Sequence, residues 1–170
     1  MSYLHHRDSS VEFTSSAEAV FDYLDDQTHL GAHMEKPSVM MLGGSMRYEF
    51  DAARGMAKGS VIKMAGSFLG IRLSVEEVVV ERRPPHFKMW ETRGTPRLLI
   101  IGAYRMGFEI AASGDICRLR VFIDYNPPLS LLAQIIAWVL APVYARWCVN
   151  SMAKDAERHF YSRSPSKGRR

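Results

Sequence analysis

Two adjacent carboxylates, Glu76 and Glu77, are the residues of this sequence best placed to move a proton. They follow an alternating run in which Ile71, Leu73 and Val75 share one face of an expected strand. Because adjacent strand residues point to opposite faces, the two carboxylates cannot form the close pair that acid–base catalysis uses. If one of them points toward the core, its burial requires a partner, and an arginine or tyrosine from a neighbouring strand is the expected one.

Two histidines and a cysteine are weaker candidates for chemistry. His29 and His33 stand four residues apart in an expected short helix, so their rings could share a face and bind a metal with a third ligand. No further cluster of metal-ligating residues accompanies them, so solvated helix histidines are the preferred interpretation and no metal site is expected. Cys148 has no neighbouring base, and beside Trp147 it is expected to pack as a small apolar residue.

The charge distribution argues against a nucleic-acid partner. Of the 22 Lys and Arg residues, four lie in the last ten residues, 161–170, and the remaining 18 equal the 18 acidic residues in number. The body is therefore neutral, and residues 161–170 are expected to form a basic, disordered tail. No glycine-rich loop precedes a helix and no basic strand is interleaved with aromatic residues, so we expect no nucleotide or other cofactor and no nucleic acid.

Length and composition predict one domain, over residues 8–160. The chain has 170 residues, of which 47% are hydrophobic, enough apolar surface for one sizeable core. Two cysteines, Cys117 and Cys148, are too few for a disulfide framework and fit a reducing compartment. Residues 1–10 have no apolar stretch of the kind a signal peptide needs, so a cytoplasmic protein is expected.

The hydrophobic period changes twice along the chain. A strand around residues 11–13 is followed by a helix that begins at Ala17 and by a second short helix at about 28–34. A period of two then predicts strands at about 46–50, 60–68, 71–83, 87–92, 98–112 and 116–125, with a break at residues 94–96. One long helix, Leu129 to Phe160, closes the sequence. Antiparallel hairpins with one apolar face need a cover, and this helix is the element long enough to supply it.

Aromatic and methionine side chains predominate on the expected inward face of the strands. Tyrosine and tryptophan combine an apolar body with one polar group, and methionine tolerates irregular space. A cavity for a hydrophobic ligand is the prediction, and a filled core is the alternative. The residues expected to line the cavity are Tyr48, Phe50, Met64, Leu73, Trp90, Tyr104, Met106, Phe108, Tyr125, Leu132 and Ile136.

The order of these elements, together with the segments 90–102, 104–109 and 144–148, resembles the helix-grip fold of START-domain proteins, birch-pollen-allergen-like proteins and polyketide cyclases, the SRPBCC superfamily. The resemblance covers residues 10–160 and implies an α+β fold, a twisted antiparallel sheet of about six or seven strands around a long C-terminal helix. Members bind lipids, quinones, hormones or polyketides, and only some are enzymes. No catalytic motif is carried over.

That resemblance implies a protein that binds a hydrophobic or amphipathic small molecule between the sheet and the helix. The first alternative is an enzyme of the polyketide cyclase or dehydratase type, in which a pocket tyrosine or the inward member of the Glu76/Glu77 pair moves a proton on an enolisable substrate. The second is a membrane-associated quinone or lipid chaperone.

The long helix has apolar residues on two sides. Three- and four-residue steps predict that Leu129, Leu132, Ile136, Leu140, Val143 and Trp147 face the sheet. The opposite side then carries Leu131, Ile135 and Trp138, which argues for a partner: a homodimer, a loop or the surface of a membrane. Pro142 is expected to kink the helix, because it removes the donor for the carbonyl of Trp138.

Overall fold

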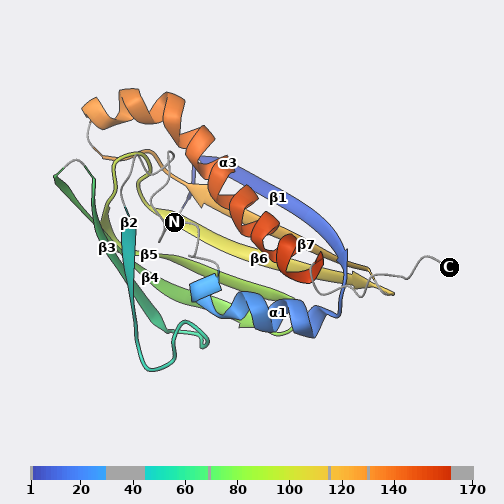
Figure 1. The fold of residues 1–170 in the computed structure, drawn as a ribbon. Coiled ribbons are helices and arrows are strands. Elements are labelled where there is room, and N and C mark those ends of the chain that lie inside the picture. The colour runs from blue at the N-terminus through green and yellow to red at the C-terminus, as the bar shows by residue number, and fades with distance from the viewer. Residues whose placement is uncertain (1, 30–44, 69, 115, 130, 162–170) are drawn as a thin grey trace.

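The computed structural model describes residues 2–29, 45–68, 70–114, 116–129 and 131–161. A seven-stranded antiparallel sheet has the order β1-β7-β6-β5-β4-β3-β2 and curves around the C-terminal helix (Figure 1). The strands are β1 (His5–Thr14), β2 (Ser45–Phe50), β3 (Val61–Phe68), β4 (Ile71–Arg83), β5 (Phe87–Arg97), β6 (Tyr104–Ser113) and β7 (Ile116–Tyr125), and the helices are α1 (Ala17–Asp25) and α3 (Leu131–Tyr161).

Helix α1 begins where the sequence predicts. The Ser16 hydroxyl caps it by accepting a hydrogen bond from the Ala19 amide at 3.2 Å. Its apolar side is buried against the sheet. There the rings of Phe21 and of Phe108 from β6 pack edge to face, with their centroids 5.6 Å apart. Residues 27–29 are again helical, and the rest of the predicted second helix, His33 included, lies outside the described residues.

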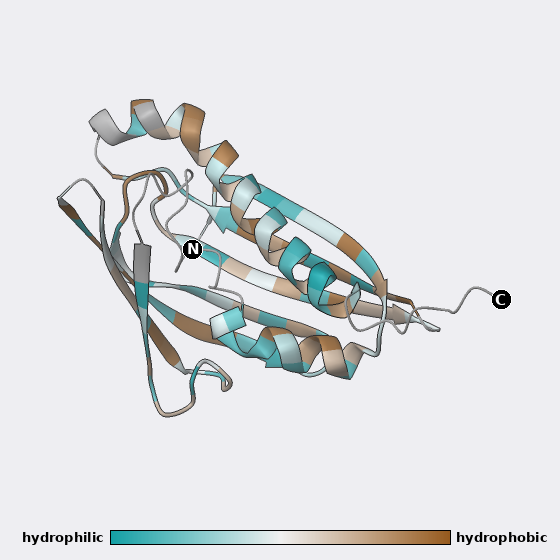
Figure 2. Cartoon of the chain, viewed as in Figure 1, coloured by the Kyte–Doolittle hydropathy of each residue, from teal (hydrophilic) through white to brown (hydrophobic). Residues whose placement is uncertain are grey.

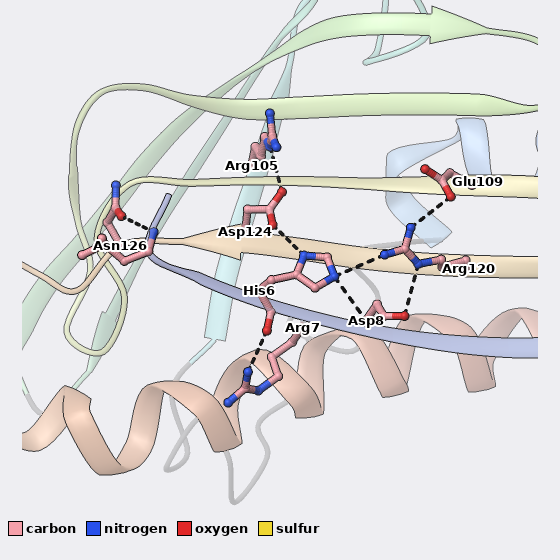
Figure 3. Close-up of polar contacts among 9 residues, drawn as sticks. His6, Arg7, Asp8, Arg105, Glu109, Arg120, Asp124 and Asn126 are labelled. Carbon is pink, nitrogen blue, oxygen red and sulfur yellow. Dashed lines mark hydrogen bonds and ion pairs between the residues drawn. The ribbon is translucent and has the colours of Figure 1, made fainter. Parts of the chain in front are cut away.

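The strands alternate between two faces (Figure 2). The face covered by α1 and α3, here called the inner face, holds most of the buried apolar residues. The outer face holds an ion-pair network that joins β1, β6 and β7 (Figure 3). There Arg105 lies 2.8 Å from Asp124, and Arg120 lies 3.1 Å from both Asp8 and Glu109. Together with the Arg118–Glu12 pair at 2.8 Å, these contacts join outward-facing side chains of adjacent strands.

Two strand boundaries differ from the prediction. β5 does not break at residues 94–96 but continues to Arg97, because Gly94 adopts φ +69° and allows an irregularity in the pairing with β4. β6 begins at Tyr104 rather than at residue 98. The residues before it form a connection in which the Gly102 amide donates to the Asn126 carbonyl at 2.8 Å. A Cβ on Gly102 would lie 2.5 Å from the carbonyl oxygen of Pro127, so only glycine permits this close approach.

Helix α3 packs on the inner face over β1 and β7 (Figure 1). Its buried side is mostly small, formed by Ala137, Ala141, Ala145, Cys148, Val149, Met152, Ala153, Ala156 and Phe160. The predicted sheet-facing stripe is wrong at Leu129, Leu140 and Val143, which are exposed, whereas Trp147 is half-buried and packs against the core. Alanines bring the helix backbone close to the sheet, and large side chains in those positions would hold it away. The backbone of Leu132 and Ile136 is helical, but their side chains lie outside the described part.

Pro142 lies inside α3, and Figure 1 shows the helix bending between its first part and the longer part that follows. A proline in a helix interior removes one hydrogen bond and crowds the preceding turn, which accounts for the bend. Among the described residues, no helix combines the length and the apolarity needed to cross a bilayer.

Candidate functional site

One carboxylate lies within the apolar inner face. The alternation along β4 places Leu73, Val75 and Val79 on this face, and Glu77 stands between the last two. Glu77 is only 4% exposed. Its neighbour Glu76 points to the outer face, where Arg93 lies 3.5 Å away. The prediction that only one of the two acids can face the core is therefore confirmed.

The Glu77 carboxyl is held by donors from β5, the strand next to β4, and from β6, the strand beyond β5. The Tyr104 hydroxyl, on β6, donates a hydrogen bond to Glu77 Oε1, and the indole N–H of Trp90, on β5, donates a second. Pairing positions these donors, because Glu77 lies opposite Thr92 and the Thr92 hydroxyl accepts from the Tyr104 amide at 3.2 Å. The partner is thus a tyrosine, as predicted, but it comes from β6, two strands away from β4, and not from a neighbouring strand.

Among the described residues, no cation lies directly against this carboxyl. Burial raises the pKa of Glu77 to about 7, because removing a carboxylate from water outweighs the hydrogen bonds from Tyr104 and Trp90 and the more distant charge of Lys88. Burial and the adjacent Glu77 also raise the pKa of the Tyr104 hydroxyl well above its usual value. Near neutral pH the phenol therefore keeps its proton, and the carboxyl is protonated in about half of the molecules.

Two further tyrosines lie close to this pair. Tyr144 from α3 and Tyr48 from β2 are near enough that their charges would raise the pKa of Tyr104. Tyr144 also hydrogen-bonds the thiol of Cys148, one helical turn away. Burial raises the pKa of Cys148 to about 12, so its thiol stays protonated and packs as the sequence predicts.

The structure brings nine of the eleven predicted ligand residues to one face. By strand register, the inner face carries Tyr48, Phe50, Met64, Leu73, Trp90, Tyr104, Met106, Phe108 and Tyr125. The side chains of the other two, Leu132 and Ile136, lie outside those described. Phe108 is fully buried against α1, whereas Tyr48, Phe50 and Leu73 are only half-buried. Whether these residues bind a ligand remains a prediction.

Tyr125 supplies a polar atom that the rest of the described chain does not use. It is 1% exposed and lies beside Tyr104 in the β6–β7 pair, with the His5 ring 5.2 Å away. Its hydroxyl has no hydrogen-bond partner among the described residues. A buried hydroxyl ordinarily finds a partner, which makes this group a candidate contact for a bound molecule.

Sequence reasoning considered Glu77 but did not place it among the ligand residues, and it missed Tyr144. The available signal was positional: Ala141 follows Ala137 by four residues and Tyr144 follows Ala141 by three, which places Tyr144 next to the buried side of α3. His29 instead stacks on Tyr23 at 4.3 Å, with Nδ1 2.8 Å from the Tyr23 carbonyl oxygen. No three His, Cys, Asp or Glu side chains gather as metal ligands in the part of the chain described.

Solved structures with this architecture include plant and bacterial proteins. The chain is similar to major latex-like protein 151 from Panax ginseng, with a TM-score of 0.60 at 12% identity over 92% of this chain and 97% of the other. It is similar to truncated norcoclaurine synthase from Thalictrum flavum, with a TM-score of 0.65 at 14% identity over 96% and 98%. The Zhui aromatase/cyclase from Streptomyces sp. R1128 gives a TM-score of 0.61 at 13% identity over 97% and 99%.

These neighbours are Bet v1-like members of the SRPBCC superfamily, and they share the seven-stranded sheet and long terminal helix. The helix-grip fold predicted from the sequence is therefore confirmed. No family model and no curated protein matches the sequence. At such low identity, the likeness establishes the architecture, and function must be argued from the residues of the inner face.

Proposed function

We propose that this protein binds a hydrophobic or amphipathic small molecule, such as a lipid, a quinone or a polyketide-like compound, between the inner face of the sheet and α3. The observation that carries the proposal is the buried Glu77 carboxyl, which is hydrogen-bonded to Tyr104 on a predominantly apolar face. Apolar contact supplies the affinity, and the few polar groups fix the orientation of the ligand.

The chemistry of these polar groups defines what they recognise. A protonated Glu77 can donate a hydrogen bond to a carbonyl or hydroxyl oxygen, and the Tyr125 hydroxyl provides a second contact on the same face. A strongly anionic ligand group would be disfavoured here, because no cation among the described residues lies directly against the Glu77 carboxyl to neutralise it. The preferred ligand is therefore neutral, largely apolar and oxygenated at one end.

Organic extraction of protein purified without detergent tests this proposal. We expect a lipophilic compound at near-stoichiometric amount, absent from a mock purification and identified by mass spectrometry. The Glu77→Leu variant should retain about a tenth of it, because a hydrogen bond from a buried acid contributes on the order of a tenfold change in affinity. Glu76→Gln is the matched control, since Glu76 points outward and should leave the yield unchanged.

An empty wild-type protein that also fails to take up fatty acids, ubiquinone analogues and aromatic polyketides would contradict the binding proposal. If the wild type and Glu77→Leu yield equal amounts of the compound, Glu77 does not contribute to its binding. A thermal melt of each variant shows whether a loss of ligand merely follows from a loss of folded protein.

A second candidate function is proton transfer on an enolisable substrate, as in a cyclase or dehydratase. The observation that favours it is a carboxyl whose pKa lies at about 7, within hydrogen-bond contact of a phenol. Two of the structural neighbours carry enzyme names, norcoclaurine synthase and aromatase/cyclase. In this function Glu77 would remove or return a proton next to a carbonyl group, and Tyr104 would hold the carboxyl in place.

Hydrogen–deuterium exchange separates the two functions. If the protein is an enzyme of this type, it should accelerate exchange of the acidic protons of an aryl β-diketone in D2O, as read by NMR. The Glu77→Gln variant should lose on the order of a hundredfold or more of that acceleration while still binding the probe. If the wild type binds the probe but does not accelerate its exchange, the protein is a carrier and the enzymatic function is contradicted.

A further inference from the structure

A row of buried side chains crosses the inner face at right angles to the strands. The register places Ile62 on β3 opposite Glu77 on β4, Glu77 opposite Thr92 on β5, and Tyr104 on β6 opposite Tyr125 on β7. The hydrogen bond from the Tyr104 amide to the Thr92 hydroxyl joins the two halves of this row. All five residues are buried, and four of them are polar. The row therefore forms a polar band across a predominantly apolar face.

Gln27 adds a buried amide at the β3 end of this row. Its side chain meets that of Ile62 at Gly55, where a Cβ would lie 2.7 Å from Gln27 Cγ and 3.3 Å from Ile62 Cδ1. Gln27 is 5% exposed, and its Nε2 has no hydrogen-bond partner among the described residues. The β3 end of the row thus carries a buried donor that lacks an acceptor in the described part of the chain.

Hydrogen bonds on both sides hold Gln27 in this position. Asp26 Oδ1 accepts from the Thr28 amide at 2.9 Å and from the Thr28 hydroxyl at 2.7 Å, which fixes the turn that follows α1. In the connection between β2 and β3, the Ser60 hydroxyl accepts from the Gly55 amide at 2.8 Å. The Gln27 amide therefore lies between two segments that are each held by hydrogen bonds.

Tyr125 stands at the other end of the row. Its hydroxyl is likewise buried without a partner among the described residues. β3 lies four strands from β7, which is roughly 19 Å along the sheet, and the distance is shorter across its concave side (Figure 1). A buried donor without an acceptor destabilises a folded protein, so two such groups at the ends of one row indicate that a bound molecule supplies their partners.

We propose that Gln27 Nε2 and the Tyr125 hydroxyl bind two oxygen atoms at opposite ends of one elongated ligand, which lies across the strands. The inference rests on the proposed function and extends it from one oxygenated end to two. Gln27 Nε2 can only donate, so it binds an acceptor such as a carbonyl or ether oxygen, whereas the Tyr125 hydroxyl can donate or accept. The recognised class is a neutral, largely apolar compound with an acceptor oxygen at one end and a carbonyl or hydroxyl oxygen at the other.

Competition by linear ketones tests this arrangement on the full chain, freed of co-purified lipid. Nile red reports occupancy of the apolar site, and it is displaced by diketones of increasing length, with a carbonyl near each end, or by monoketones of the same length. At the best-matched length the diketone should bind the wild type at least about tenfold more tightly than the monoketone, because it satisfies both buried groups. Gln27→Met and Tyr125→Phe should each abolish this preference, since each leaves a single polar contact.

The melting temperature of the ligand-free variants separates a loss of binding from a loss of folded protein. Because each replaced polar atom lacks a partner, Gln27→Met and Tyr125→Phe should melt at or above the wild-type temperature. Tyr161→Phe is the matched control, since Tyr161 is 63% exposed at the end of α3 and should change neither the preference nor the melting temperature. A lower melting temperature in Gln27→Met would show that the amide is already satisfied in the ligand-free protein, which would overturn the proposal.

The binding results distinguish a failure of this inference from a failure of the proposed function. Equal affinities for diketones and monoketones at every length, or a preference that survives Gln27→Met, would overturn the ligand with two oxygenated ends and leave a site for hydrophobic molecules. A wild-type protein that binds neither Nile red nor any of the ketones would contradict the proposed function, and this inference with it.

Discussion

Replacing Asp25 with alanine is expected to lower the free energy of unfolding by about 3–5 kcal/mol, because it leaves Lys88 buried without its counter-ion. Lys88 is fully buried between α1 and the sheet, where Nζ lies 2.9 Å from Asp25 Oδ1 and donates to the Asp25 carbonyl oxygen at 2.7 Å. Arg82, on β4, completes the group with Nη2 2.8 Å from Asp25 Oδ2. The three residues fix the end of α1 to β4 and β5.

The charges of this group depend on one another. Burial alone would raise the pKa of Asp25, but hydrogen bonds from Arg82 and Lys88 hold it below its usual value. Burial lowers the pKa of Lys88, and Asp25 opposes that change. In the Asp25→Ala variant Lys88 must lose its proton or remain as a buried cation, and either outcome destabilises the folded state.

Urea unfolding at neutral pH measures the effect, and two comparisons isolate its cause. Asp22→Ala removes an exposed carboxylate from the same helix and should change the free energy of unfolding by less than about 0.5 kcal/mol. Lys88→Met leaves Asp25 paired with Arg82 and should be milder than Asp25→Ala, and the double variant should recover part of the loss. A loss below about 1 kcal/mol in Asp25→Ala would show that the ion pair is not the source of the stability.

The sequence was sufficient to predict the architecture, but it was not sufficient to predict which face of α3 is buried. Alternation along the strands is unambiguous where one face is apolar, so the order of elements and the apolar face of the sheet could be predicted. In α3 both sides are apolar, and the prediction assigned the larger side chains, such as Leu140 and Val143, to the sheet. The structure buries Ala137, Ala141 and Ala145 instead, because the distance between helix and sheet is a tertiary property that no local period encodes.

The candidate site was predictable in kind rather than in detail. A period of two implies that either Glu76 or Glu77 faces inward, and the pairing of β4 with β5 decides between them. Tyr104 was predicted as a ligand residue, but its contact with Glu77 depends on the lateral order of β4, β5 and β6 in the sheet. Lys88 was not anticipated, because a lysine in a strand is normally solvated and only the position of α1 supplies its partner.

Between about pH 5 and pH 7, the stability of the protein is expected to fall as the pH rises, because Glu77 keeps its proton in the folded state but loses it in the unfolded state. The ordinary pKa of glutamate, 4.5, applies to the unfolded chain, whereas burial raises the pKa of Glu77 to about 7 in the folded protein. Between these values the folded state binds a proton that the unfolded state has released, so the free energy of unfolding decreases with pH. The two pKa values correspond to a loss of roughly 3 kcal/mol, which is nearly complete about one pH unit above the folded-state pKa.

The Glu77→Gln variant provides the decisive comparison, because its amide cannot titrate and keeps the size of the side chain. Its stability should be nearly independent of pH across the window in which the wild type and the outward-facing control Glu76→Gln lose theirs. Asp25 and Asp124 do not obscure the result: hydrogen bonds hold their pKa values below 3.8, so their contributions are lost on acidification below this window. Urea midpoints measured from pH 5 to pH 8 give the slopes. Equal slopes in wild type and Glu77→Gln would mean that Glu77 is already ionised at pH 5. Glu77 could then neither donate a hydrogen bond to a ligand carbonyl nor carry the exchangeable proton that both proposed functions require.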